Sequence, residues 1–256
     1  MIQKNMIHEQ SPLNNEDFLE IIKNFKQTGV TIDDRGRNLI KTFEVKGLNV
    51  NVKSFKIPHV INKFAYKYLR KSKAQRSFEY ASILKEKGIL TPAPLAYYEY
   101  YNDIGLINSY YFSEHINYDL TYRELREFPK YPDYENILRQ FTRFTYTLHE
   151  NGIFFKDHSA GNTLIIKKDD HYDFYLIDLN RMRFMTLNLD DRMKNFAKLT
   201  EIPDMIEIMS DEYSKLINVD YEVILEKMWN EINKFRKKYQ ARAQLKAKFQ
   251  DKNKSQ

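Results

Sequence analysis

One short stretch of this chain carries the residue types that phosphoryl transfer requires. Asp157 follows an apolar pair and precedes Asn162 by five positions, and a second apolar run, 174–177, ends at Asp178. Carboxylate and amide oxygens are ligands that Mg²⁺ prefers, and a carboxylate can also orient or deprotonate a hydroxyl group. The pattern predicts a loop that feeds a β-hairpin, with these three side chains at one end. It indicates a centre for phosphoryl transfer to a hydroxyl.

The composition is typical of a soluble globular protein and excludes several kinds of site. The chain has 256 residues, 42% of them hydrophobic and 30% charged, which suffices for one large domain or two lobes. Cysteine is absent, so disulfides, thiolate metal sites and thiol nucleophiles are excluded. The start lacks the apolar core of a signal peptide, and no run of about 18 apolar residues occurs. We therefore expect a cytoplasmic protein, and the net charge of +6 allows anionic partners without selecting one.

The elements upstream of the loop offer a lysine and a glutamate to the same chemistry. Residues 38–45 and 48–55 alternate as two strands joined by a short turn, and Lys53 lies near the end of the second strand. A helix is predicted over 74–87, with Glu79 in its middle. A lysine neutralises triphosphate charge when a glutamate holds it in place. Taken alone, Lys53 is more simply an ordinary solvated strand lysine.

The chain changes character near residue 113. Predicted strands over 95–101 and 105–112 end there, and the sequence up to residue 150 has helical periodicity, most clearly over 134–151. We expect the first 30 residues to be a polar extension with one short helix. The predicted division is an extension (1–30), a nucleotide-binding lobe (31–112), a hinge (113–118), a catalytic lobe (119–226) and a basic tail (227–256).

The tail is strongly basic and amphipathic. Between residues 227 and 254 it has ten Lys or Arg against two acidic residues, with Met228, Ile232, Phe235 and Tyr239 at helical spacing. Basic amphipathic helices bind anionic membranes. The simpler interpretation is a helix packed on the domain with a solvated basic end, because the apolar stripe is short.

The order of these parts resembles the protein-kinase-like fold. More narrowly, the chain resembles the lipopolysaccharide kinase family, whose members phosphorylate Kdo or heptose of the inner core. The resemblance spans roughly residues 30 to 200. It implies an α+β, two-lobed fold, with an antiparallel sheet plus helix C in the N-lobe and a mainly helical C-lobe. The segments that carry it are Asp157-x4-Asn162, Ile177-Asp178-Leu179-Asn180-Arg181, Val52-Lys53-Ser54-Phe55, Arg76-Ser77-Phe78-Glu79-Tyr80-Ala81 and Gly36-Arg37-Asn38-Leu39-Ile40-Lys41.

The resemblance also implies the cofactors, ATP and Mg²⁺, and a set of roles. Asp157 would be the base, and Asn162 and Asp178 would be the metal ligands. The implied acceptor is a lipid-linked sugar, Kdo-lipid A or a core heptose, with peripheral contact to the cytoplasmic face of the anionic inner membrane. No nucleic acid is expected, because no base-reading motif is present. The implied nucleotide-binding positions are Gly36, Arg37, Asn38, Lys53 and Glu79, with backbone groups of Glu114 and Ile116 at the hinge.

Departures from the protein-kinase pattern keep alternatives open. Phe155 stands where a histidine usually precedes the catalytic Asp, and Gly36 is the only glycine of the nucleotide loop. No Ala-Pro-Glu triplet follows Asp178, which favours a small or lipid-linked acceptor over a protein. The alternatives are a kinase of another small molecule or of a protein with the same fold, and a non-catalytic pseudokinase that acts as a binding module.

The histidines and arginines near the motif have two interpretations each. His149 is expected to cap or pack at the end of its helix, whereas His158 lies in the loop and is a candidate for contact with the acceptor. Arg181 and Arg183 follow Asp178 and would either meet an anionic sugar or phosphate or form salt bridges inside the lobe.

Overall fold

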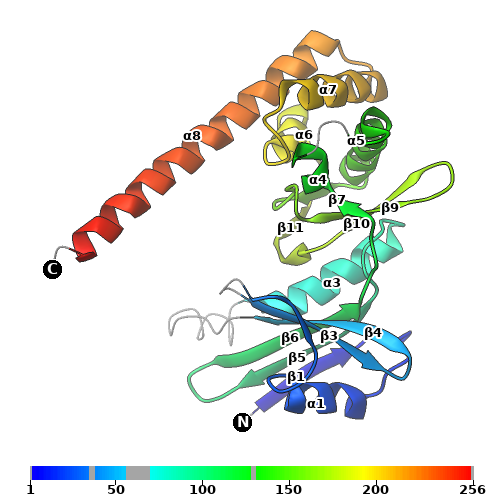
Figure 1. Cartoon of the computed structure of the whole chain (residues 1–256), viewed down its shortest axis with the longest axis vertical. Helices are drawn as coiled ribbons and strands as arrows, with labels where there is room; N and C mark the ends of the chain where they lie inside the picture. The colour runs from blue at the N-terminus through cyan, green and yellow to red at the C-terminus, as the bar shows by residue number, and fades with distance from the viewer. Residues whose placement is uncertain (1, 35–37, 56–69, 128–130, 255–256) are drawn as a thin grey trace. The chain divides into compact units, whose positions relative to one another are not determined.

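The computed structural model describes residues 2–34, 38–55, 70–127 and 131–254 (Figure 1). It contains two compact units, one made of residues 1–117 and 175–181, the other of residues 118–174 and 182–256. The chain thus leaves the first unit after Asn117, inside the segment predicted as the hinge. Antiparallel strands dominate the first unit and helices the second, so the α+β class is confirmed.

A six-stranded antiparallel sheet forms the first unit, in the order β1-β5-β6-β4-β3-β2. Two of its strands, β3 and β4, have the bounds that sequence alternation predicts, and β5 and β6 agree with prediction to within two residues. The strands are β1 (Ile2–Ile7), β2 (Val30–Asp33), β3 (Asn38–Val45), β4 (Leu48–Phe55), β5 (Pro94–Tyr101) and β6 (Leu106–Glu114).

A tight turn sets the register of β3 and β4. Lys46 and Gly47 both have positive φ, +52° and +77°, which is the backbone of a two-residue hairpin whose twist matches the strands. Val50 and Val52 consequently face the core with no exposed surface. Lys53 falls on the opposite face of the sheet, next to Tyr111 of β6.

The first 30 residues belong to the first unit and are not an extension beside it. Strand β1 pairs along its whole length with β5, and helix α1 (Asn15–Asn24) buries Phe18 and Ile21 in the core of the unit. Alternation could not reveal β1, because five of its six side chains are exposed and only its backbone joins the sheet.

A buried lysine binds carbonyl groups at the C-cap of α1 and in the turn that follows it. Lys41 is 7% exposed, and its Nζ donates hydrogen bonds of 2.8 Å to the carbonyl oxygens of Phe25 and Thr28. The last carbonyls of a helix have no intrahelical donor, and a positive charge near them is favourable. Lys41 therefore anchors α1 to the sheet by a polar contact that periodicity does not reveal.

Helix α3 (Lys73–Glu86) covers part of the same sheet. Ser72 caps it by accepting from Gln75 N at 3.0 Å. Phe78 packs edge-on against Tyr97 of β5, with ring centroids 5.4 Å apart. The apolar face predicted for this helix is thus buried, and Glu79 lies beside it on a half-buried face.

The second unit is mainly helical around one apolar core, with two short sheets. Prediction missed β7, β8 and β11, because strands of two or three residues are too short for alternation to show. The helices are α4 (Tyr122–Glu127), α5 (Tyr134–Glu150), α6 (Leu189–Phe196), α7 (Pro203–Ile217) and α8 (Tyr221–Lys254). The strands are β7 (Leu120–Thr121), β8 (Ile153–Phe155), β9 (Thr163–Lys167), β10 (Tyr172–Leu176) and β11 (Met182–Phe184).

Helix α8 begins before the predicted tail and changes environment along its length. Its first turns bury Ile224, Met228 and Ile232 in the core of the second unit. Every side chain from residue 236 to 245 is exposed, and Figure 1 draws this part as a free helical end of its unit. No helix within the described ranges has both the length and the apolarity needed to cross a bilayer.

Replacing Lys41 with Met tests the polar anchor of α1. We expect Lys41→Met to lower the free energy of unfolding by about 1–3 kcal/mol, because the carbonyl oxygens of the buried Phe25 and of Thr28 lose their donor. Lys46→Met is the matched control, since Lys46 is 57% exposed and pairs with Asp17 at the surface, a contact worth about 1 kcal/mol or less. Urea unfolding measures both variants, and an equal effect of the two would contradict the anchor.

Candidate active site

Asp157 and Asn162 lie in one loop of the second unit, between β8 and β9. Asn162 Nδ2 donates to the backbone oxygen of Asp157 at 2.8 Å. Two backbone bonds tighten the same loop, His158 N to Phe155 O at 3.0 Å and Asn162 N to Ser159 O at 2.9 Å. The structure therefore brings these two predicted residues together, and Asn162 Oδ1 remains as an oxygen that can act as a ligand.

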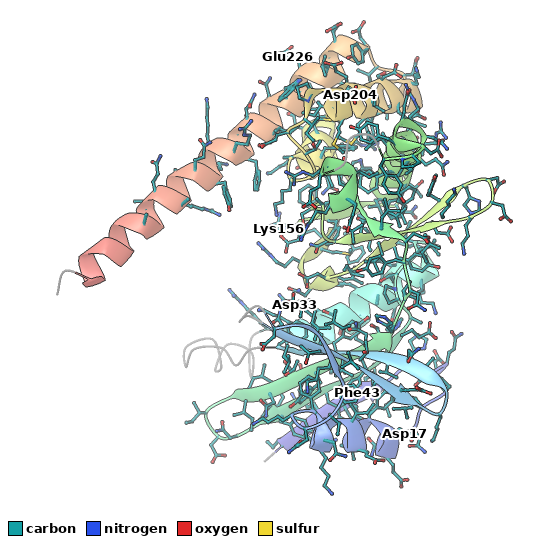
Figure 2. The ribbon with its side chains drawn as sticks, viewed as in Figure 1. Asp17, Asp33, Phe43, Lys156, Asp204 and Glu226 are labelled. Atoms are coloured by element: carbon teal, nitrogen blue, oxygen red, sulfur yellow. The ribbon has the colours of Figure 1, made fainter. Side chains whose placement is uncertain are left out.

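Lys198 is a neighbour of Asp157 that the sequence motifs do not reveal. Its Nζ lies 3.0 Å from Asp157 Oδ1 and 2.6 Å from the backbone oxygen of Lys156. Lys156 is exposed and is labelled in Figure 2. Lys198 follows α6, and no fixed spacing links it to the loop, so only the packing of α6 shows the pair. Its ammonium holds the Asp157 carboxylate in place and offsets its charge.

A buried polar chain fixes the strand that leads into this loop. His149 Nδ1 lies 2.7 Å from the Tyr213 hydroxyl, and His149 Nε2 lies 3.1 Å from Asn195 Oδ1. Asn195 Nδ2 in turn donates to the backbone oxygen of Phe155 at 2.7 Å. Burial lowers the pKa of His149 to about 4, so its ring is neutral at neutral pH. His149 thus packs and bonds at the end of its helix, as predicted, and helps to position Asp157.

His158 points into the core of the second unit. It is 1% exposed, and its ring centroid lies 5.3 Å from that of Phe141 and 5.7 Å from that of Phe155. Neither ring nitrogen has a hydrogen-bond partner in the structure as described. Burial first, and then the charges of His149 and Lys198, lower the pKa of His158 to about 3. Contact of His158 with an acceptor, one of its two sequence-based interpretations, is therefore wrong.

In the first unit, Asp178 forms an ion pair with Lys53. The side chains are 35% and 13% exposed respectively. Asn180 Nδ2 donates to the same Asp178 oxygen, Oδ1, at 2.9 Å, so Oδ2 is left for another ligand. Asp178 has φ +60°, a conformation that costs a non-glycine residue about 1–3 kcal/mol and often marks functional sites.

Two further bonds hold the segment that carries Asp178 on the first unit. Leu176 N donates to the Leu90 carbonyl at 3.0 Å, and Thr91 Oγ1 donates to the Leu176 carbonyl at 2.8 Å. The connection between α3 and β5 therefore holds Leu176 by two hydrogen bonds, and Lys53 holds Asp178 by an ion pair. Sequence patterns placed residue 178 in the catalytic lobe, whereas these contacts place it with the strands of the first unit.

Glu79 does not hold Lys53 in this structure. Its carboxylate accepts from Lys71 Nζ at 2.8 Å and from Gln75 Nε2 at 3.0 Å. The predicted pairing of Lys53 with Glu79 is therefore wrong here. The physical reason is that Lys71, just before α3, satisfies the glutamate locally, while Asp178 satisfies Lys53.

The predicted nucleotide loop is described in part. Gly36 and Arg37 lie outside the described residues, so their predicted role stays a prediction. Asn38 is the first residue of β3, and its buried Oδ1 has no hydrogen-bond partner among the residues that the structure describes. A buried unpaired acceptor is unusual and is consistent with a position that receives a ligand donor.

The predicted hinge begins inside a strand. Glu114 is the last residue of β6, and its backbone N–H donates to the Ala93 carbonyl at 2.9 Å. Ile116 makes no hydrogen bond within the described part of the chain. Of these two predicted adenine-binding positions, Ile116 is the one whose backbone N–H remains available.

The side-chain oxygens that remain without a hydrogen bond are of the kind that binds hard cations such as Mg²⁺. Asn162 Oδ1 in the second unit and Asp178 Oδ2 in the first unit are each left after the hydrogen bonds given above, and Mg²⁺ prefers oxygen ligands. The described residues include no cluster of three or more His, Cys, Asp or Glu side chains that would form a metal cage. A Mg²⁺ ion held by few protein oxygens completes its shell with water and phosphate oxygens.

Because His149 and His158 are buried and neutral, we expect the free energy of unfolding to fall as the pH falls. The folded pKa of His158, about 3, lies below the unfolded value of about 6.5. The unfolded chain therefore takes up the proton first as the pH falls, and the contribution to stability is full above about pH 6.5 and shrinks toward pH 3. At pH 5 the loss amounts to about 2 kcal/mol for one such histidine.

We expect His158→Leu to flatten the dependence of unfolding free energy on pH between 7 and 5, with His149 responsible for the remaining slope. Urea unfolding at a series of pH values measures it. The control is His171→Gln, because His171 is exposed and its hydrogen bond with Asp170 raises its pKa. An unchanged slope in His158→Leu would contradict the burial of a neutral ring.

Comparison with known proteins supports the fold. No family model matches the chain, and no curated protein matches it in sequence. Among solved structures, it is similar to one described as "WaaP in complex with acyl carrier protein", with a TM-score of 0.61 and 16% identity. The match covers 93% of this chain and 98% of the WaaP chain. Over nearly its whole length the chain therefore has the fold of WaaP, the two-lobed protein-kinase-like fold that its resemblance to lipopolysaccharide kinases implied.

Proposed function

We propose that this chain is an ATP-dependent phosphotransferase that phosphorylates a sugar hydroxyl of the lipopolysaccharide inner core, on Kdo or heptose. The observation that carries the proposal is the Asp157–Asn162 loop, closed by its own side-chain hydrogen bond and supported by Lys198. The ion pair of Lys53 with Asp178 adds the cation and carboxylate that a triphosphate requires. The likeness in fold to WaaP, a lipopolysaccharide core kinase, supports the choice of acceptor.

In the proposed reaction Asp157 acts on the acceptor hydroxyl. Its carboxylate accepts a hydrogen bond from the hydroxyl and takes the proton as the oxygen attacks the γ-phosphorus. The bond from phosphorus to the ADP oxygen breaks as the new bond to the acceptor oxygen forms. Lys198, 3.0 Å from the carboxylate, limits its rotation, and the bond from Asn162 to the Asp157 backbone limits movement of the loop.

The nucleotide is assigned to groups of the first unit. Lys53 would offset phosphate charge, Asn38 would lie at the nucleotide loop with Gly36 and Arg37, and Glu114 and Ile116 would meet adenine. When bound, Mg²⁺ would offset the charge of the phosphate oxygens, and Asn162 and Asp178 are the residues proposed to hold it.

Helix α8 is proposed to place the enzyme at an anionic membrane surface. Lys237, Lys238 and Arg242 are exposed, and Tyr239 and Leu245 are 67% and 57% exposed. A helix with free basic and apolar side chains binds anionic headgroups. A lipid-linked acceptor would be presented at such a surface. WaaP was captured with an acyl carrier protein, so a carrier protein is the other partner to test.

Substitutions at the proposed nucleotide-binding residues and at the proposed base should have different effects on ATP binding and on phosphoryl transfer. With ATP and Mg²⁺ at 100 times the dissociation constant, the wild type should gain roughly 2.7 kcal/mol of stability. Lys53→Met and Asp178→Asn should lose this thermal shift. Asp157→Asn should keep it and lose about 10²–10⁴-fold of transfer from γ-labelled ATP, because the proton acceptor is gone.

Asp170→Asn is the matched control, since Asp170 lies in an exposed turn of the same unit, and it should behave as the wild type. Equal product from wild type and Asp157→Asn would refute the assigned base. Absence of any nucleotide shift would favour the non-catalytic module, and transfer to a different small molecule or protein would favour the alternative kinase.

The membrane assignment predicts a charge-dependent association. Wild-type protein should sediment with vesicles that contain phosphatidylglycerol and not with phosphatidylcholine alone. Combined replacement of Lys237, Lys238 and Arg242 with Gln should weaken binding by about 1 kcal/mol per charge. Lys46→Gln, in the other unit, is the control. Equal sedimentation of the triple variant and wild type would contradict a role for α8.

A further inference from the structure

We propose that Arg123 binds an anionic group of the acceptor beside the hydroxyl that is phosphorylated. The inference rests on the proposed function and deepens it, because it restricts the acceptor to an alcohol that carries a carboxylate or a phosphate. Arg123 lies in the first turn of α4 in the second unit and belongs to none of the sequence motifs.

The guanidinium of Arg123 lies directly against the loop at Gly161. A Cβ atom on Gly161 would lie 2.6 Å from Arg123 Nη2 and 3.5 Å from its Cζ. The φ of Gly161 is not in the left-handed region, so backbone conformation does not require glycine here. The guanidinium occupies the space that a Cβ would take, so a side chain here would have to displace it, at a position between Asp157 and Asn162 along the chain.

Arg123 has no carboxylate partner among the described residues, unlike four other arginines of its unit. The adjacent Glu124 is turned away, since it accepts from the backbone N–H of Thr121 at 2.8 Å and from the Thr121 hydroxyl. Arg123 is exposed and always charged, and its guanidinium N–H donors have no acceptor in the described part of the chain, so they remain for a ligand. Arginines of the unit that do have partners are Arg139 with Asp211, Arg143 with Glu212, Arg192 with Glu150 and Arg236 with Glu201.

The charges around the loop favour an anion. Residues 157–162 contain one carboxylate, that of Asp157, and Lys198 already pairs with it. Arg123 therefore adds a positive charge that no group of the loop offsets. A guanidinium binds a carboxylate or phosphate through two parallel hydrogen bonds, which fixes orientation as well as position. An acceptor held in this way presents a neighbouring hydroxyl to Asp157 in a defined geometry.

Binding to small probes tests the inference without requiring turnover. The probes are Kdo with its methyl ester, and mannose 6-phosphate with mannose, titrated by NMR in the absence of ATP. Wild type should bind at least one charged probe more tightly than its neutral counterpart. Arg123→Gln should weaken that binding about 10–100-fold, the equivalent of one charge-assisted pair, and leave the neutral probes unchanged. The charged probe affected distinguishes a carboxylate from a phosphate.

Two further variants test whether weaker probe binding by Arg123→Gln reflects loss of the guanidinium contact or a general effect on the structure. Gly161→Ala should displace the guanidinium and weaken the same probe, whereas Arg236→Gln, a paired arginine on α8, should not. In transfer assays Arg123→Gln should raise KM for the acceptor about tenfold or more, with kcat and the thermal shift by ATP retained.

The inference would be overturned if the wild type did not prefer a charged probe over its neutral counterpart. It would also be overturned if Arg123→Gln bound all probes like the wild type, or bound charged and neutral probes more weakly by the same factor. Loss of the ATP shift in Arg123→Gln would assign the guanidinium to the nucleotide and also overturn it. Failure of the proposed function is separate, because it would appear as charged-probe binding without transfer of label to any acceptor.

Discussion

The ion pair between Lys53 and Asp178 is the constraint on which the first unit depends. An ammonium that is only 13% exposed needs a partner, because an unpaired buried charge is strongly destabilising. The partner comes from a distant part of the sequence and adopts a strained positive φ to reach it. The turn at Lys46 and Gly47 sets the register that brings Lys53 to this position, and the bonds from Leu90 and Thr91 hold the segment of Asp178 against it.

The second unit orders the loop of Asp157 and Asn162 by different contacts. The amide of Asn162 closes the loop on Asp157, Lys198 fixes the carboxylate, and the chain from His149 through Asn195 holds the strand behind it. Each unit therefore preorganises its own groups by internal hydrogen bonds and ion pairs. In the proposed reaction such groups would stabilise the transition state, because preorganised groups need not reorganise as charge develops.

Sequence patterns predicted the elements that a single apolar periodicity defines. β3, β4 and α5 follow from apolar alternation and helical spacing, and the short Asp157-to-Asn162 spacing places both residues in one loop. Patterns failed for β1, whose side chains are mostly exposed, and for strands of two or three residues. Lys198 and Arg123 are close to the loop only through the packing of α6 and α4, which no local spacing encodes. The partner of Glu79 is local: Lys71, eight residues before it, forms the ion pair that was predicted for the more distant Lys53.

Product analysis with the wild-type protein tests the central claim most directly. The protein is incubated with γ-labelled ATP, Mg²⁺ and lipid A precursors that carry no Kdo, Kdo alone, or Kdo and heptose. The proposed function predicts label in a phosphate ester on Kdo or heptose, and none on the precursor without Kdo. Label on no precursor, or equal label on the precursor that lacks Kdo, would contradict it.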